Sequence, residues 1–140
     1  MSVWDEVVKD NEQEEIYPTV PAGEYEFEVV DSKGKEYQPK PGGKLKHCAE
    51  IDLRLQIKTA DGTKVNVFDR LYSDPSTQWK MTAFAKSIGI YEENMTPRAF
   101  LNVVGEKGKA FIKLKPATNE YPARNEVGKY LPAEQQELPF

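Results

Sequence analysis

The feature that most constrains the fold of this chain is a strict alternation of polar and aliphatic residues at positions 50–58. Successive side chains of a strand point to opposite sides, so the four aliphatic residues of this segment share one face. After Asp61-Gly62, a pair that favours a tight turn, residues 65–72 return with a strand-like pattern. The two segments therefore predict a β-hairpin with one buried face, and a chain that folds around a sheet.

Three further segments have the period of a strand. Residues 24–29 alternate charged and apolar side chains, and residues 109–115 alternate with Leu114 among the inward-facing positions. A weaker strand is expected at 124–131. Residues 31–46 are rich in Pro, Gly and Lys, so they predict a long loop, and loops of that length in small domains tend to be functional or mobile.

The period changes to that of a helix after the third predicted strand. Asp74 is a favoured N-cap residue, Pro75 suits the first helical position, and Gly89 is a common terminator. Apolar residues recur between them at intervals of three and four, which predicts a helix over 75–88 with one apolar stripe. A second short helix is expected at 96–101.

The order of these elements is typical of one fold. A mainly β chain of five strands with an α-helix between strands 3 and 4 has the layout of an OB-fold, a small five-stranded barrel. The length of 140 residues fits one domain, and a β-sandwich needs more strands. We predict an acidic N-terminal extension at 1–19, an OB-fold domain at 20–131, and an acidic C-terminal tail at 132–140 that ends in Leu-Pro-Phe.

The net charge of −4 hides an uneven distribution. Residues 1–19 hold six acidic residues and one lysine, and residues 131–140 hold two acidic residues and no basic one. The body is therefore basic: segment 33–46 has five lysines and one glutamate, and segment 107–129 has six basic and two acidic residues. Because charges act locally in physiological salt, a basic body can attract phosphate in spite of the overall sign. Solvated surface lysines are the alternative interpretation.

An OB-fold binds single strands by combining a cationic groove with aromatic faces on which bases stack. The two basic segments fall on the loops and the fourth strand that the fold would use, and aromatic residues occur in the same places. For any single aromatic residue, covering the barrel is the alternative to stacking on a base. The predicted DNA-binding residues are Lys33, Lys35, Tyr37, Lys40, Lys44, Lys46, Arg54, Arg70, Tyr72, Phe111, Lys113, Lys115, Tyr121 and Arg124.

A metal-dependent nuclease is the enzymatic alternative. Asp52 with Glu50 or Asp69 has the ligand chemistry of Mg²⁺, but carboxylates that alternate with aliphatic residues normally face water. His47 and Cys48 are too few for a zinc site, and the common nucleotide-binding and hydrolase motifs are absent from the sequence. We therefore expect a binding protein rather than an enzyme, without catalytic residues, metal or cofactor.

The expected compartment is the cytoplasm. Cys48 is the only cysteine and has no partner for an internal disulfide, and the first residues lead into acidic rather than basic and apolar sequence. No segment approaches the 18 or so consecutive apolar residues of a membrane helix, so no membrane partner is expected. A homo-oligomer is an open alternative to a monomer.

The last residues carry a resemblance. Glu137-Leu138-Pro139-Phe140 closes an acidic segment with an apolar tip. It resembles the C-terminal tip of bacterial single-stranded-DNA-binding proteins, an acidic run followed by Ile-Pro-Phe that docks recombination, replication and repair enzymes. The resemblance implies that Phe140 fills an apolar pocket on a partner, that its carboxylate meets a basic residue, and that Pro139 keeps the peptide extended. A tip that packs on its own domain is the alternative.

The body of the chain is also similar to a group of small bacteriophage proteins associated with phage recombination, most visibly in Pro-Ala-Gly-Glu-Tyr at 21–25. Together these features predict sequence-independent binding of single-stranded DNA in phage replication or recombination, in the cytoplasm of a bacterial host, with a C-terminal peptide that recruits partner enzymes. The alternative is a protein-binding adaptor or a structural β-barrel without a nucleic-acid role.

Overall fold

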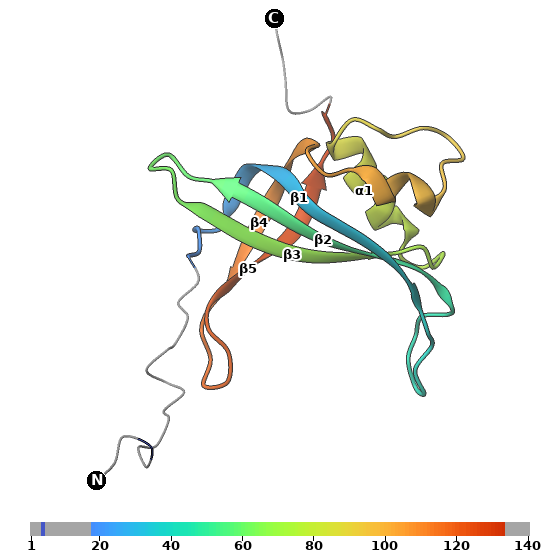
Figure 1. The fold of residues 1–140 in the computed structure, drawn as a ribbon, viewed down its shortest axis with the longest axis horizontal. Coiled ribbons are helices and arrows are strands. Elements are labelled where there is room, and N and C mark those ends of the chain that lie inside the picture. Colours follow the sequence, from blue (N-terminus) through green and yellow to red (C-terminus); the bar gives the residue numbers. More distant parts are fainter. Residues whose placement is uncertain (1–3, 5–17, 134–140) are drawn as a thin grey trace, which may run out of the picture.

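The structure is a computed structural model that describes residue 4 and residues 18–133. Its five strands form one antiparallel sheet that curls into a half-barrel, with a short α-helix packed at one side (Figure 1). The sheet order is β3-β2-β1-β4-β5. In chain order the elements are β1 (Gly23–Tyr37), β2 (Cys48–Lys58), β3 (Lys64–Tyr72), α1 (Gln78–Ser87), the 3₁₀ helix η3 (Pro97–Asn102), β4 (Lys107–Lys115) and β5 (Arg124–Leu131).

The hairpin predicted from the alternating pattern is confirmed. β2 and β3 pair without interruption from Glu50↔Tyr72 to Lys58↔Lys64, and the four aliphatic residues of β2 are all buried. Gly62 in the turn has a φ of 89°, a conformation that glycine adopts without steric cost. The sequence pattern therefore identifies both the turn and the face of the sheet that packs inward.

β1 is longer than predicted, and residues 31–37 are strand rather than loop. Its first part pairs with β4 and its second part pairs with β2, from Glu28↔Gln56 to Tyr37↔Cys48. A register shift between Val29 and Asp31 marks a bulge, which bends the strand at the change of partner. The Gly- and Lys-rich composition suggested a loop over the whole of 31–46, but pairing with the strongly patterned β2 extends the strand and leaves residues 38–47 as the connection.

The core lies between the inner face of the curled sheet and α1. Phe84 of α1 is fully buried, and its ring centroid lies 6.3 Å from that of Phe27, 5.2 Å from that of Tyr130 and 6.0 Å from that of Phe100. Truncation of a buried aromatic side chain of this kind typically costs about 3–5 kcal/mol. The predicted apolar stripe of the helix is thus the part of α1 that attaches it to the sheet.

The start of α1 differs from the prediction. Asp74 is not its N-cap: the helix begins at Gln78, with Thr77 in the cap position and no side-chain cap. The Asp74 carboxylate instead accepts hydrogen bonds from the N–H of Ser76 at 3.0 Å and from the N–H of Lys46 at 3.1 Å. These bonds stabilise a turn before the helix and tie it to the end of the β1–β2 connection. The predicted terminator Gly89 is confirmed, with a φ of 78°.

The predicted orientation of β4 is correct except at its end. Ala110 and Ile112 are buried as expected, whereas Leu114 is 40% exposed. Leu114 is the last residue but one of β4, next to the β4–β5 connection and beyond Ile112, the last buried residue of the strand.

The two edge strands of the sheet, β3 and β5, approach each other and are joined by side chains. The hydroxyl of Tyr130 on β5 donates to Oδ2 of Asp69 on β3 at 2.5 Å, and Nζ of Lys80 on α1 donates to Oδ1 of the same carboxylate at 2.6 Å. Burial raises the pKa of Tyr130 well above its ordinary value, and the charge of Asp69 adds to the shift. The hydrogen bonds of Asp69 with Tyr130 and Lys80 therefore connect β3, β5 and α1. The arrangement is mainly β and is consistent with an OB-like fold.

Candidate nucleic-acid interface

One outward face of the sheet gathers most of the predicted contact residues. Because strands alternate, β1, β2 and β3 each present every second side chain to this face, which we call the outer face. The antiparallel register places these side chains in rows across the three strands. The rows are Lys35–Glu50–Tyr72, Lys33–Asp52–Arg70 and Asp31–Arg54–Phe68.

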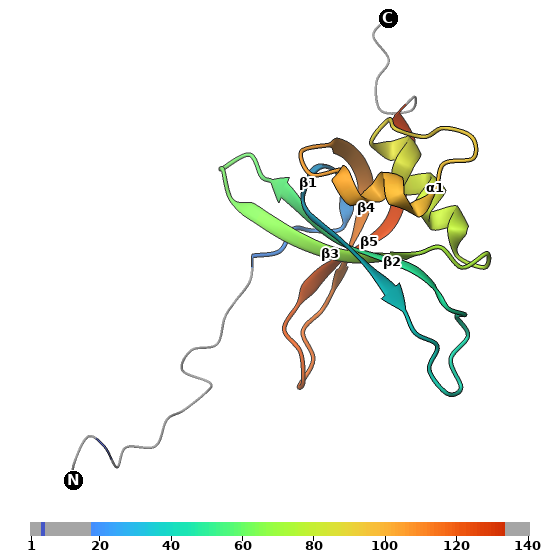
Figure 2. The ribbon, with the colours of Figure 1, turned by 45° about the vertical axis from the view of Figure 1, so that its right-hand side comes forward.

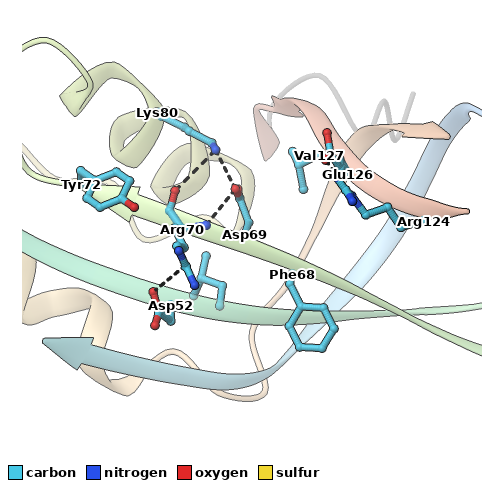
Figure 3. Close-up of a pocket in the computed structure, with 10 residues that line it drawn as sticks. Asp52, Phe68, Asp69, Arg70, Tyr72, Lys80, Arg124, Glu126 and Val127 are labelled. Carbon is cyan, nitrogen blue, oxygen red and sulfur yellow. Dashed lines mark hydrogen bonds and ion pairs between the residues drawn. The ribbon is translucent and has the colours of Figure 1, made fainter. Parts of the chain in front are cut away.

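A groove of about 830 Å³ runs along this face, between β3 and the start of β5 (Figure 3). Phe68 lies on one side of it and Arg124 and Glu126 lie on the other. Lys80 enters from α1 above Arg70. The groove combines charged side chains of both signs with aromatic surface, and it is lined by Asp52, Leu53, Phe68, Asp69, Arg70, Tyr72, Lys80, Arg124, Glu126 and Val127.

A second hollow of about 440 Å³ continues the groove toward the β4–β5 connection. The two share Phe68, Arg124 and Glu126, so a ligand that lies over Phe68 has access to both. The guanidinium of Arg124 lies over the ring of Tyr121 at 5.9 Å from its centroid. The path formed by the groove and the hollow is therefore bordered by aromatic rings at both ends, Tyr72 at one and Tyr121 at the other.

Among the residues that line the groove, Phe68 is the large apolar residue with the greatest exposure. It is 69% exposed although it sits in the middle of a strand, and Trp79 of α1, outside the groove, is 68% exposed. Tyr72, at the end of the same strand, packs edge-on against Tyr37 of β1, with ring centroids 5.3 Å apart. An exposed aromatic ring beside cations is the arrangement on which the bases of a single strand can stack.

Two cations of the outer face, Lys35 and Arg70, are paired with carboxylates, whereas the exposed Arg54 makes no ion pair among the described residues. Nζ of Lys35 lies 3.1 Å from Oε2 of Glu50 and 3.2 Å from Oδ2 of Asp52. Nε of Arg70 lies 3.6 Å from Oδ1 of Asp52. The positive charge of this face is thus partly neutralised before any ligand binds.

The two carboxyl groups at the centre of this network differ in their protonation. Burial raises the pKa of Glu50, and a hydrogen bond with Asp52 raises it further, against the effect of Lys35. Burial also favours the protonated form of Asp52, but hydrogen bonds with Glu50 and Lys35 and the charges of Lys35 and Arg70 outweigh it and lower the pKa of Asp52. Asp52 is therefore the member of the pair that stays ionised, and Glu50 is the member that takes up a proton first as pH falls.

A similar pairing occurs on the β4–β5 hairpin. Oε1 of Glu126 lies 3.1 Å from Nε of Arg124, and Oε2 lies 3.5 Å from Nζ of Lys115. Burial opposes ionisation of Glu126, but the hydrogen bond with Arg124 and the charge of Lys115 lower its pKa. Within residues 18–133, in contrast, Lys40, Lys44 and Lys46 of the β1–β2 connection and Lys113 of β4 make no ion pair.

The structure places the predicted contact residues in three groups. Lys33, Lys35, Tyr37, Arg54, Arg70 and Tyr72 are on the outer face; Lys40, Lys44 and Lys46 are in the β1–β2 connection; Phe111, Lys113, Lys115, Tyr121 and Arg124 belong to β4, β5 and their connection. The β1–β2 and β4–β5 hairpins both extend from the same side of the sheet (Figures 1 and 2). Phe111 and Lys113 lie against Gly128 and are not among the residues that line the groove.

Several groove residues were missing from the predicted set. Phe68 shares the outward phase of Arg70 and Tyr72, so the alternation of β3 contains the signal for it. Glu126 and Lys80 had no comparable signal, because their position at the groove depends on how β5 and α1 pack against β3. The predicted partner-binding residues Glu137, Leu138, Pro139 and Phe140 lie outside the described residues.

The described residues hold no group of three or more His, Cys, Asp or Glu side chains placed to bind a metal ion. Within the same part of the chain, no helix has the length and apolar character needed to cross a membrane. Comparison with known proteins gives no match, either to a family model or to a curated protein. Functional conclusions therefore rest on the geometry of the groove.

Proposed function

We propose that this protein is an OB-fold protein that binds single-stranded DNA without strong sequence preference along the groove between β3 and β5. The observation that carries the proposal is the position of Phe68, an exposed ring in the middle of a strand, between cations of β3 and β5. Bases stack on such rings with about 1–3 kcal/mol each, and stacking needs no particular base. Phosphates then lie within reach of the two lysine-bearing hairpins.

The OB-fold assignment is supported by the order of the sheet and by the approach of β3 to β5, which bring the β1–β2 and β4–β5 connections to one side. Those are the connections through which OB-folds grip oligonucleotides. The single strand is favoured over duplex because only unpaired bases expose the faces that stack on Phe68 and Tyr72. The role fits phage replication or recombination in the cytoplasm of a bacterial host, without catalysis.

An electrophoretic shift assay with oligo-dT and with duplex DNA of equal length, at two salt concentrations, tests the proposal. We expect preference for the single strand and an affinity that falls steeply with salt, because each neutralised phosphate releases counterions. Absence of oligo-dT binding at low salt would contradict it. That result would favour the alternative, a protein-binding adaptor, for which the largely apolar hollow beside Tyr121 and Pro122 provides a peptide-sized surface.

The C-terminal peptide carries a second part of the proposal. Leu138-Pro139-Phe140 would dock on recombination or replication enzymes through its apolar tip and carboxylate. Deletion of these three residues should leave oligo-dT binding intact or increase it, and should abolish capture of the partner enzyme. A large fall in melting temperature would show instead that the tip packs on its own domain.

A further inference from the structure

Two carboxylates occupy the centre of the outer face, where a purely phosphate-binding surface would carry cations only. Glu50 and Asp52 are successive outward residues of β2, between the rows of β1 and β3. Glu50 is only 4% exposed, whereas the side chain of Asp52 is 33% exposed and lines the groove. Asp52 is therefore the accessible member of this acidic pair, and Glu50 lies beside it on the same face, almost covered.

The cations next to this centre are already engaged. Lys35 is within 3.2 Å of both carboxylates and Arg70 is 3.6 Å from Asp52. A phosphate placed over the middle of the face would meet the half-buried carboxylate of Asp52 and would have to compete with it for both cations. A base in the same place carries no such charge, and it finds ring surface at Phe68 and Tyr72 on the adjacent strand.

Most exposed cations without a carboxylate partner lie away from Glu50 and Asp52; the exception on the outer face is Arg54, which lies two residues after Asp52 on β2 and opposite Phe68. Among the described residues, Lys40, Lys44 and Lys113 are exposed and make no ion pair. These lysines belong to the hairpins that extend from one side of the sheet (Figure 2). The charges thus favour one orientation of a bound DNA single strand, with its bases toward the outer face and its phosphates toward the hairpins.

We infer that Glu50 and Asp52 are specificity-determining residues that make the groove select exposed bases and reject bare sugar–phosphate backbone. The inference deepens the proposed function and rests on it. Repulsive elements of this kind raise specificity at the expense of raw affinity. The carboxylates thus act on the ligand by repulsion as well as by holding Lys35 and Arg70 in place.

Protonation of Glu50 provides a second way to detect the repulsion. Because the pKa of Glu50 is raised, acidification removes one of the two repelling charges, and backbone binding should increase. The other charged or titratable groups around Glu50 are Lys35 and Glu36 of β1, Asp52 of β2, Arg70 and Tyr72 of β3, and Arg98 of η3.

The test compares two labelled probes of equal length by fluorescence anisotropy: oligo-dT and an oligonucleotide made entirely of abasic sugar–phosphate units. The full-length protein is compared with the Glu50→Gln/Asp52→Asn double variant. We expect the variant to bind the abasic probe about tenfold more tightly and oligo-dT only about two- to threefold more tightly, so that the ratio of the two affinities falls. An unchanged ratio would overturn the inference.

The Glu92→Gln/Glu93→Gln variant is the matched control, since it makes the same change of charge at exposed positions between α1 and η3. It should leave the ratio unchanged, and an equal fall in the control would also overturn the inference. If the double variant does not fold, the wild-type protein is measured at decreasing pH instead. We then expect its affinity for the abasic probe to increase relative to its affinity for oligo-dT, and a constant ratio of the two affinities would overturn the inference. Wild type that binds neither probe at low salt would refute the proposed function itself.

Discussion

Two cations of the outer face, Lys35 and Arg70, differ from the lysines of the β1–β2 connection in how they are held. Lys35 and Arg70 each lie within 4 Å of a carboxylate and on regular strands, whereas Lys40 and Lys44 follow the end of β1 and make no ion pair among the described residues. Lys46 is intermediate, because its charge helps to lower the pKa of Asp74 although the two side chains form no ion pair. A paired cation offers only part of its charge to a phosphate, while a free lysine offers all of it. The difference indicates that basic content alone does not identify the phosphate-binding part of such a surface.

Under the proposed function, the outer face and the β1–β2 connection would have different tasks. The outer face has fixed geometry, with a 5.3 Å edge-on contact between Tyr37 and Tyr72 and ion pairs across the strands, so it is suited to receive flat bases. The β1–β2 connection has charge without such fixed partners, so it is suited to follow a backbone of variable path. Binding without sequence preference requires both.

The largest effect is expected from reversing the charge of the connection. Lys40→Glu/Lys44→Glu/Lys46→Glu should weaken oligo-dT binding roughly a hundredfold at low salt, because it replaces attraction of phosphate by repulsion. The melting temperature should fall only slightly, since the three side chains are exposed and only Lys46 has a charged neighbour, Asp74. Anisotropy titration and thermal denaturation measure the two quantities.

The matched control reverses three exposed lysines outside the groove, Lys58, Lys86 and Lys107. It changes the net charge equally, so it should weaken binding by less than about fivefold through long-range electrostatics alone. If the two triple variants lose affinity equally, the connection has no special role.

The next effect concerns the ring at the centre of the groove. Phe68→Ala should cost about 1–3 kcal/mol of binding to oligo-dT, the usual contribution of one stacked base. Its effect on stability should be small because the side chain is 69% exposed. Phe111→Ala serves as comparison: Phe111 is predicted from the sequence to contact DNA but does not line the groove, so its removal should cost less. Equal losses of affinity in the two variants would show that the DNA-binding surface also includes β4.

A smaller effect is expected from the paired cations. Arg70→Gln or Arg124→Gln should weaken oligo-dT binding by only about two- to threefold, because each guanidinium is already shared with Asp52 or Glu126 and exposed pairs contribute little. The slope of log affinity against log salt concentration should change by less than the value that corresponds to about one released counterion. A loss as large as that of the triple lysine variant would show that pairing does not reduce their contribution.

The smallest effect on binding is expected at Asp61, in the β2–β3 turn. Its carboxylate accepts hydrogen bonds from the hydroxyl of Thr59 and from the N–H of Thr63. These bonds, above all the one from Thr59, lower the pKa of Asp61 to about 2. A lowered pKa contributes stability above the ordinary value of 3.8, which is lost as pH falls through about 2. Asp61→Asn should therefore lower the melting temperature at neutral pH, with the difference from wild type disappearing near pH 2.

Asp61→Asn also tests the role of carboxylates in the groove. It should leave DNA affinity unchanged, unlike substitution of Glu50 and Asp52. An increase in affinity would show that any lost negative charge, wherever it lies, strengthens binding.

The parts of the fold with strong local patterns were predictable. The alternation of β2 identifies its buried face, and the stripe that includes Phe84 identifies the face of α1 that packs on the sheet, because both patterns result from burial of one side. The role of Gly89 as helix terminator was also predictable, since its positive φ is a local property. The length of β1 was not, because residues 31–37 become strand only by pairing with β2.

The candidate site was predictable as a set of residue types and less so as an arrangement. Most predicted residues are on the outer face or on the two hairpins that extend from one side of it. The pairing of Lys35 with Glu50 and Asp52 depends on the register between β1 and β2, which no local pattern determines. The contact of Glu126 with the groove depends on the approach of β5 to β3. Charge counts along the sequence therefore overestimate the positive charge that the groove offers to a ligand.

The central claim is that single-stranded DNA lies over Phe68 with its bases toward the outer face. Titration of the isotopically labelled protein with oligo-dT, followed by NMR amide shifts, tests it most directly. We predict that the largest shifts fall on β2 and β3, at the start of β5 and in residues 38–47, and that α1 and η3 change little. Shifts confined to α1 and η3, or no shifts at all, would contradict the account.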